Sequence, residues 1–140
     1  MNFSVNKKNC KYYVDKEKKK VVCVIPKTEF MAARFIEANY NVNIIYFDEK
    51  VSDMLIMPRQ FTGIATCHEE DEFDEEMGKL IAYNKARRKL NCSLFKRLNA
   101  FANYIDNQLN NFVIKSNEYG EKQIARELAR ENKIKEHFGE

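Results

Sequence analysis

The chain has 140 residues and a net charge of +3, with 44% hydrophobic and 32% charged residues. This composition and length predict one soluble domain with one hydrophobic core, and the mild charge falls short of a typical duplex-binding domain. No apolar run approaches the roughly 20 residues of a membrane span, and the N-terminus lacks the apolar core of a signal peptide, so we expect a cytoplasmic protein.

Residues 1–67 are predicted to form an antiparallel meander of about five strands. Residues 11–14 and 21–25 are rich in β-branched and aromatic side chains and flank a polar, lysine-rich connection, the pattern of a hairpin. The remaining predicted strands are 42–47, 54–57 and 61–67, and residues 2–5 could add one more. Residues 30–38 contain alanines and predict one or two helical turns.

An acidic loop then leads into a helix. Asp74 is a good N-cap, because its carboxylate can accept the free N–H of a residue two or three positions further on. Glu75 and Glu76 would occupy the first turn, where negative charge opposes the helix dipole favourably. Met77, Leu80 and Ile81 follow at helical spacing.

Residues 74–138 are predicted to be helical with two interruptions. The first helix should end near Leu90, because Asn91, Cys92 and Ser93 suggest a kink and Ser93 can cap the next helix. This second helix carries an apolar stripe through residues 94–113, and residues 117–120 interrupt it before a charged helix at 121–137. The expected fold is α+β: one domain, 1–140, in which a β-rich half (1–67) is followed by two or three kinked helices in the helical half (74–138).

No residue pattern indicates catalysis. The four cysteines form no C-x-x-C pair, so we expect reduced, partly buried thiols rather than a zinc site or a disulfide framework. Cys67 and His68 are strand neighbours that would point to opposite faces. The acidic run 69–76 lacks the alternation and turn glycine of an EF-hand, and helix-start charge explains it better. We therefore expect no metal, no cofactor and no enzymatic activity.

Two groups of polar and aromatic residues are candidates for ligand binding. Arg126 and Arg130 are four residues apart on one helical face and could bracket a pyrophosphate, although ion pairs with Glu127 or Glu131 would also explain them. Phe101 could stack on a base and Asn111 could recognise an adenine edge, with core packing the alternative for Phe101.

Another basic group, Arg87, Arg88 and Arg97, lies near the predicted kink. Stabilisation of a helix C-terminus by positive charge is a sufficient explanation for it.

Residues Gly63 to Ala82 fit the pattern G-[IV]-A-x-C-x-x-x-D-x-F-D-x-E-x-G-x-x-[IL]-A, which resembles a segment of small bacteriophage proteins from Gram-positive hosts. With its β-rich first half and kinked C-terminal helices, the chain is similar to the Thoeris anti-defence sponge family. The motif covers about 20 residues, and the order of elements agrees over nearly the whole chain.

The resemblance implies a non-enzymatic viral protein of the host cytoplasm. Members of that family sequester cyclic ADP-ribose isomers made by a TIR-domain defence enzyme, and some also bind cyclic trinucleotides. Their pockets lie between subunits, so a homo-oligomer is expected, without a membrane partner. The motif transfers no pocket residue, and the candidates Phe101, Asn111, Arg126 and Arg130 rest on chemistry alone.

Two other classes of function remain open. The chain could inhibit another bacterial defence system by binding a protein, as anti-CRISPR proteins do. It could also be a small nucleic-acid-binding phage protein, which the modest charge and the lack of a recognisable stacking motif disfavour.

Overall fold

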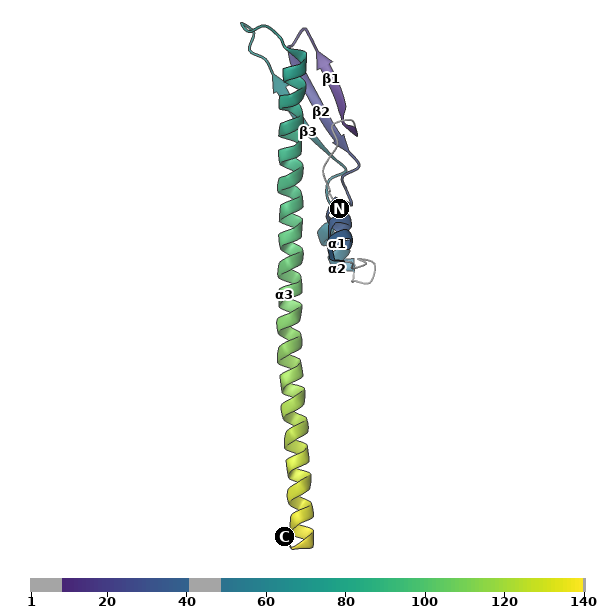
Figure 1. Cartoon of the computed structure of the whole chain (residues 1–140), viewed down its shortest axis with the longest axis vertical. Helices are drawn as coiled ribbons and strands as arrows, with labels where there is room; N and C mark the ends of the chain where they lie inside the picture. The colour runs from purple at the N-terminus through teal and green to yellow at the C-terminus, as the bar shows by residue number, and fades with distance from the viewer. Residues whose placement is uncertain (1–8, 41–48, 140) are drawn as a thin grey trace. The chain divides into compact units, whose positions relative to one another are not determined.

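The computed structural model describes residues 9–40 and 49–139 and has the expected α+β class. Its strands are β1 (Lys11–Asp15), β2 (Lys20–Pro26) and β3 (Gln60–Thr66), joined as one antiparallel sheet in the order β1-β2-β3. The helices are α1 (Met31–Tyr40), α2 (Glu49–Leu55) and α3 (Glu75–Phe138), shown with the strands in Figure 1.

The predicted hairpin is confirmed as β1 and β2. Tyr13 pairs with Val22, and the turn closes through the Asp15 carboxylate, which accepts the backbone N–H groups of Glu17 and Lys18 at 3.1 Å each. Lys19 completes the turn with a left-handed φ of 48°. Local hydrogen bonding by an aspartate is therefore what reverses the chain here.

The prediction of about five strands is wrong, because the sheet has three strands in the part of the chain that the structure describes. Residues 54–57 do not form a strand, since Met54 and Leu55 end α2. Val51 and Leu55 are both buried, and their spacing of four residues places them on one face of a helix. The apolar run therefore follows the period of a helix and not that of a strand. The predicted strands at 42–47 and 2–5 lie outside the described residues.

Two other segments of the first half follow the sequence prediction. The helical turns expected at 30–38 are α1, and the extended segment expected at 61–67 is β3. No helix in the described ranges is both long and apolar enough to cross a membrane.

The start of α3 is as predicted. The Asp74 carboxylate accepts the backbone N–H of Met77 at 3.1 Å, and Glu75 and Glu76 occupy the first turn. The cap therefore fixes where the acidic loop ends and the helix begins.

The predicted interruptions of the helical half are wrong. Residues 91–93 and 117–120 lie inside α3, which is one helix from Glu75 to Phe138. Asparagine, cysteine and serine each cost less than about 0.7 kcal/mol in a helix and glycine about 1 kcal/mol, and neither segment contains the proline that would break one. Unfavourable local propensity is thus insufficient to end the helix.

The chain divides into two compact units, Met1–Phe101 and Ala102–Glu140. The first unit contains the sheet, α1, α2 and the beginning of α3, and the second contains the rest of α3.

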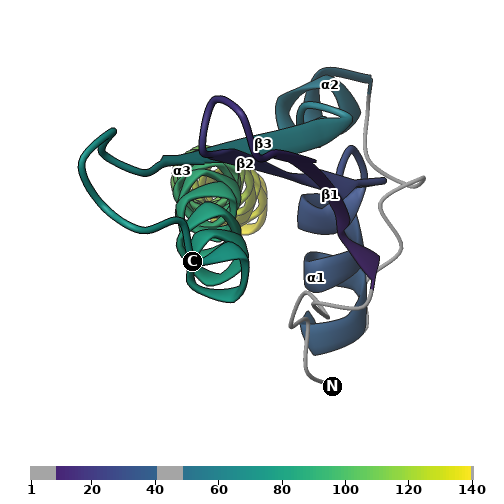
Figure 2. The same ribbon diagram turned by 90° about the horizontal axis from the view of Figure 1, so that it is seen from above.

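The core of the first unit lies between the sheet and the first turns of α3, which run beside β2 and β3 in Figure 2. Val21, Cys23 and Ile25 alternate inward on β2, opposite Ala65, Gly63 and Phe61 of β3. From α3, four buried residues fill the same layer: Ala82, Tyr83, Ala86 and Leu90.

Gly63 lets the helix approach the sheet closely. A Cβ at this position would overlap the carbonyl oxygen of Ala82 and lie 2.5 Å from the backbone nitrogen of Ala86. A Cβ at Gly78 would lie 2.7 Å from a methyl group of Val21. Both contacts are tighter than a side chain permits, so glycine and alanine set the distance between helix and strand.

Candidate functional site

The sequence pattern from Gly63 to Ala82 has a packing role in the structure. Its two glycines and Ala82 lie where α3 meets the sheet, and Asp74 caps the helix. These residues fix the packing of α3 on the sheet, and the same segment lines a cavity of about 220 Å³ that includes Asp71, Asp74 and Met77. The glycines and the N-cap of the pattern therefore have a structural role.

The acidic loop between β3 and α3 is held by its backbone. The Lys19 ammonium group donates to the carbonyl oxygens of Glu69 at 2.9 Å and Asp71 at 2.6 Å. The Cys67 thiol faces the Glu72 carbonyl at 3.7 Å, and His68 Nδ1 accepts the Glu70 N–H at 3.4 Å. No cluster of three metal-ligating side chains occurs in the described ranges, this loop included.

The cysteines are free thiols of graded exposure, with Cys23 buried and Cys92 exposed. Burial raises the pKa of Cys23 to about 11, so this thiol stays protonated and unreactive at neutral pH. Burial also raises the pKa of the neighbouring Tyr12 to about 12. Both pKa shifts thus follow from packing, since Cys23 is buried and Tyr12 is half-buried.

The part of α3 with the largest net positive charge lies in the first unit. Residues 77–101 contain no aspartate or glutamate but seven basic residues: Lys79, Lys85, Arg87, Arg88, Lys89, Lys96 and Arg97. The net charge of the whole chain is only +3, so positive charge is concentrated here. Such a concentration raises the local potential and favours an anionic partner.

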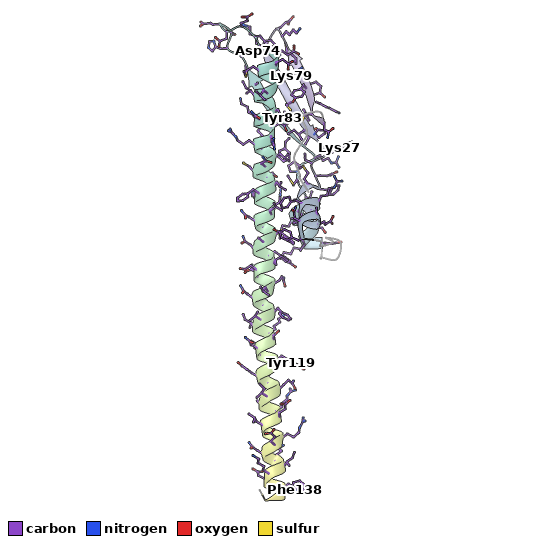
Figure 3. All side chains as sticks on the ribbon, viewed as in Figure 1. Lys27, Asp74, Lys79, Tyr83, Tyr119 and Phe138 are labelled. Carbon is purple, nitrogen blue, oxygen red and sulfur yellow. The ribbon has the colours of Figure 1, made fainter. Side chains whose placement is uncertain are left out.

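Four of these seven cations are engaged inside the protein. Lys85 and Lys89 donate to the carbonyl oxygens of Ile64 and Thr62 on β3, at 3.1 and 3.0 Å. Lys79 lies 3.7 Å from both Glu75 and Glu76 and over the ring of Tyr12 (Figure 3 labels Lys79). Arg97 donates to the Met54 carbonyl at 3.5 Å.

The other three cations, Arg87, Arg88 and Lys96, are exposed and make no hydrogen bond or ion pair with the described part of the chain. Arg87 and Arg88 line an open cavity of about 490 Å³ on the solvent-facing side of α3. The other residues that line it are Asn84, Asn91, Cys92 and Phe95. We call these six residues the arginine surface.

The arginine surface combines three kinds of recognition group on one rigid helix. Asn84, Arg88, Asn91 and Phe95 are spaced by four, three and four residues and therefore share a face. Guanidinium groups bind phosphate through paired hydrogen bonds, and carboxamides can read an adenine edge. Phe95, which is 67% exposed, offers a ring on which a base can stack.

The residues predicted as ligand-binding are distributed over the two units. Phe101 is half-buried in the first unit, where it makes a contact with its surroundings. Asn111, Arg126 and Arg130 are exposed in the second unit. Arg126 and Arg130 are one turn apart, but Asn111 lies roughly 22 Å from Arg126 along the helix at about 1.5 Å per residue.

The prediction that Arg87 and Arg88 stabilise a helix C-terminus is wrong, because α3 continues for many turns beyond them. Asn84, Asn91 and Phe95 were not among the predicted candidates. The signal that could have found them is the absence of acidic residues from 77 to 101, combined with the spacing of four, three and four.

Comparisons with models of known families, with characterised proteins and with solved structures find no match to this chain.

Proposed function

We propose that this protein is a non-enzymatic phage anti-defence sponge, which binds cyclic ADP-ribose-type nucleotides in the host cytoplasm and withholds them from immune signalling. The arginine surface is the observation that carries the proposal. It offers phosphate-binding, base-reading and base-stacking groups together, and none of them is an acid/base pair placed for turnover.

The charge of the site supports an anionic ligand. Arg87 and Arg88 have no partner in the described chain, so a bound pyrophosphate would not have to displace an existing ion pair. Each charge-assisted hydrogen bond contributes roughly 1.5–3 kcal/mol. The choice of a cyclic ADP-ribose isomer, and of a phage origin, comes from the resemblance carried by residues 63–82.

Arg126 and Arg130 remain a second candidate for the phosphate contact. Both guanidinium groups are exposed, and neither forms an ion pair with Glu127 or Glu131 or with another described residue. We expect Arg126→Ala or Arg130→Ala to weaken binding of cyclic ADP-ribose by roughly 10- to 150-fold, from the loss of one such bond.

Isothermal titration calorimetry measures this effect, with Lys115→Ala as the matched control. Lys115 is an exposed cation on the same helix, so its removal changes the net charge equally. Folding should be unchanged in all three variants, because exposed charges contribute little to stability. If both arginine variants bind like the control, the arginine pair has no role in the site.

A second function is favoured by the acid-free basic segment itself. Seven cations without an acidic residue between 77 and 101 would also suit the phosphate backbone of single-stranded nucleic acid. Binding of that kind loses affinity steeply as salt rises, because counterions are released. Titration with a single-stranded oligonucleotide at low and high salt therefore separates the two functions.

A further inference from the structure

The second unit carries an uncovered apolar face. From Ile105 onward its large apolar side chains are exposed, with fractions that range from 38% at Ile105 to 71% at Phe138. At about 100° per residue, all but Ile114 fall on one half of the helix circumference. The members of this apolar face are Ile105, Leu109, Phe112, Val113, Tyr119, Ile124, Leu128, Ile134 and Phe138; Figure 3 labels Tyr119 and Phe138.

The charges of this unit favour a second copy of the same chain as the partner. Residues 102–139 contain six acidic and six basic residues, so their net charge is zero. Two copies of this segment therefore do not repel each other through net charge, and no partner of opposite charge is required. The apolar face runs from Ile105 to Phe138, which is roughly 50 Å of helix. A face of this length without a partner in its own chain is typical of a helix that pairs with another helix.

The acidic residues within the apolar face decide the direction of pairing. Glu127 and Glu131 lie among Ile124, Leu128 and Ile134, and no described residue neutralises them. In a parallel, in-register pair each position meets its own copy across the seam. Both carboxylates would then meet their own copies, and like charges in that position are destabilising.

An antiparallel pair avoids this conflict. With a two-fold axis between Glu121 and Lys122, Ile105 meets Phe138 and Leu109 meets Ile134. Glu127 then faces Ser116 rather than a second carboxylate, and Gly120 faces Gln123. The same register places Asp106 of one copy opposite His137 of the other, two positions from Lys135. Six of the nine members of the apolar face thus meet one another, while Phe112, Val113 and Leu128 meet Glu131, Arg130 and Lys115. No carboxylate meets a second carboxylate in this register.

We propose that residues 102–138 of two copies form an antiparallel helical pair centred between Glu121 and Lys122. The pairing uses the second unit alone and does not depend on what the arginine surface binds.

Sedimentation equilibrium of the full chain tests the pairing with two matched variants. Leu109→Asp places a charge on the apolar face and should raise the dimer dissociation constant by at least about 100-fold. Ile114→Asp makes the same change on the opposite side of the helix and should leave the constant within about threefold of the wild type. A monomeric wild-type chain at micromolar concentration, or equal effects of the two variants, would overturn the proposal.

Disulfide trapping tests the direction of the pair. In a Cys92→Ser background, chains carrying Ser116→Cys are mixed with chains carrying Glu127→Cys and oxidised. The antiparallel register predicts mainly mixed dimers joined between positions 116 and 127, identified by mass spectrometry of the linked peptides. Dimers that join each position to itself would establish a parallel pair and overturn the register.

Discussion

Replacing Gly63 by alanine should lower the free energy of unfolding of the first unit by about 3 kcal/mol, at the upper end of the usual range for overpacking. The added methyl group would overlap the Ala82 carbonyl oxygen and lie 2.5 Å from the Ala86 nitrogen. Both atoms belong to the backbone of α3, so the helix itself would have to move away from β3. A typical domain has only about 5–15 kcal/mol of stability to lose.

Urea unfolding followed through the near-ultraviolet circular dichroism of the tyrosines measures this loss. Among them, Tyr83 is buried where helix and sheet meet (Figure 3 labels Tyr83). Two other glycines serve as graded controls. Gly78→Ala should cost less, because the added methyl group meets a side-chain methyl group of Val21 and not the backbone of another element. Gly120→Ala meets nothing within 4 Å and should stabilise the helix by up to about 1 kcal/mol. Equal stability of the Gly63 and Gly120 variants would contradict the packing of α3 on β3.

Replacing Arg87 and Arg88 together by alanine should weaken binding of cyclic ADP-ribose by at least about 100-fold. Two charge-assisted hydrogen bonds at roughly 1.5 kcal/mol each, with about 1.4 kcal/mol per decade, set this lower limit. Both side chains are exposed and make no ion pair with a described residue, so folding should not change.

The matched control for this pair is Lys16→Ala with Lys18→Ala, which removes two exposed charges from the turn between β1 and β2. Calorimetry compares the two double variants with the wild type at the same salt concentration. A comparable loss in both would mean that net charge, and not the arginine surface, attracts the ligand. No loss in either would place the site elsewhere.

Strong local chemistry made part of the fold predictable. Asp15 and Asp74 bond to nearby backbone N–H groups, so the hairpin turn and the start of α3 could be inferred from neighbouring residues. Residues 54–57 were misassigned because a short apolar run fits either a strand or a helix, and the burial of Val51 and Leu55 decides the matter. The breaks in α3 were predicted from the low helix propensity of residues 91–93 and 117–120 alone. That propensity is too small an effect to end the helix, which continues through both segments.

The candidate site was less accessible to sequence reasoning. Arg88 and Phe95 are seven residues apart, and only a helix that continues through Asn91 places them on one face. Lys85 and Lys89 look equivalent to Arg88 in the sequence, yet they are engaged with β3. Which cations are available to bind a ligand thus depends on which side of α3 packs on the sheet. Gly63 sets the distance between the sheet and the helix.

Release of a bound nucleotide by heat tests the proposed function most directly. The full chain is incubated with cyclic ADP-ribose isomers, freed of unbound ligand by gel filtration, and heated; the supernatant is then analysed by chromatography and mass spectrometry. A sponge should return the intact cyclic nucleotide in stoichiometric amount. Recovery of no nucleotide would contradict sequestration, and recovery of linear ADP-ribose would show that the protein is an enzyme.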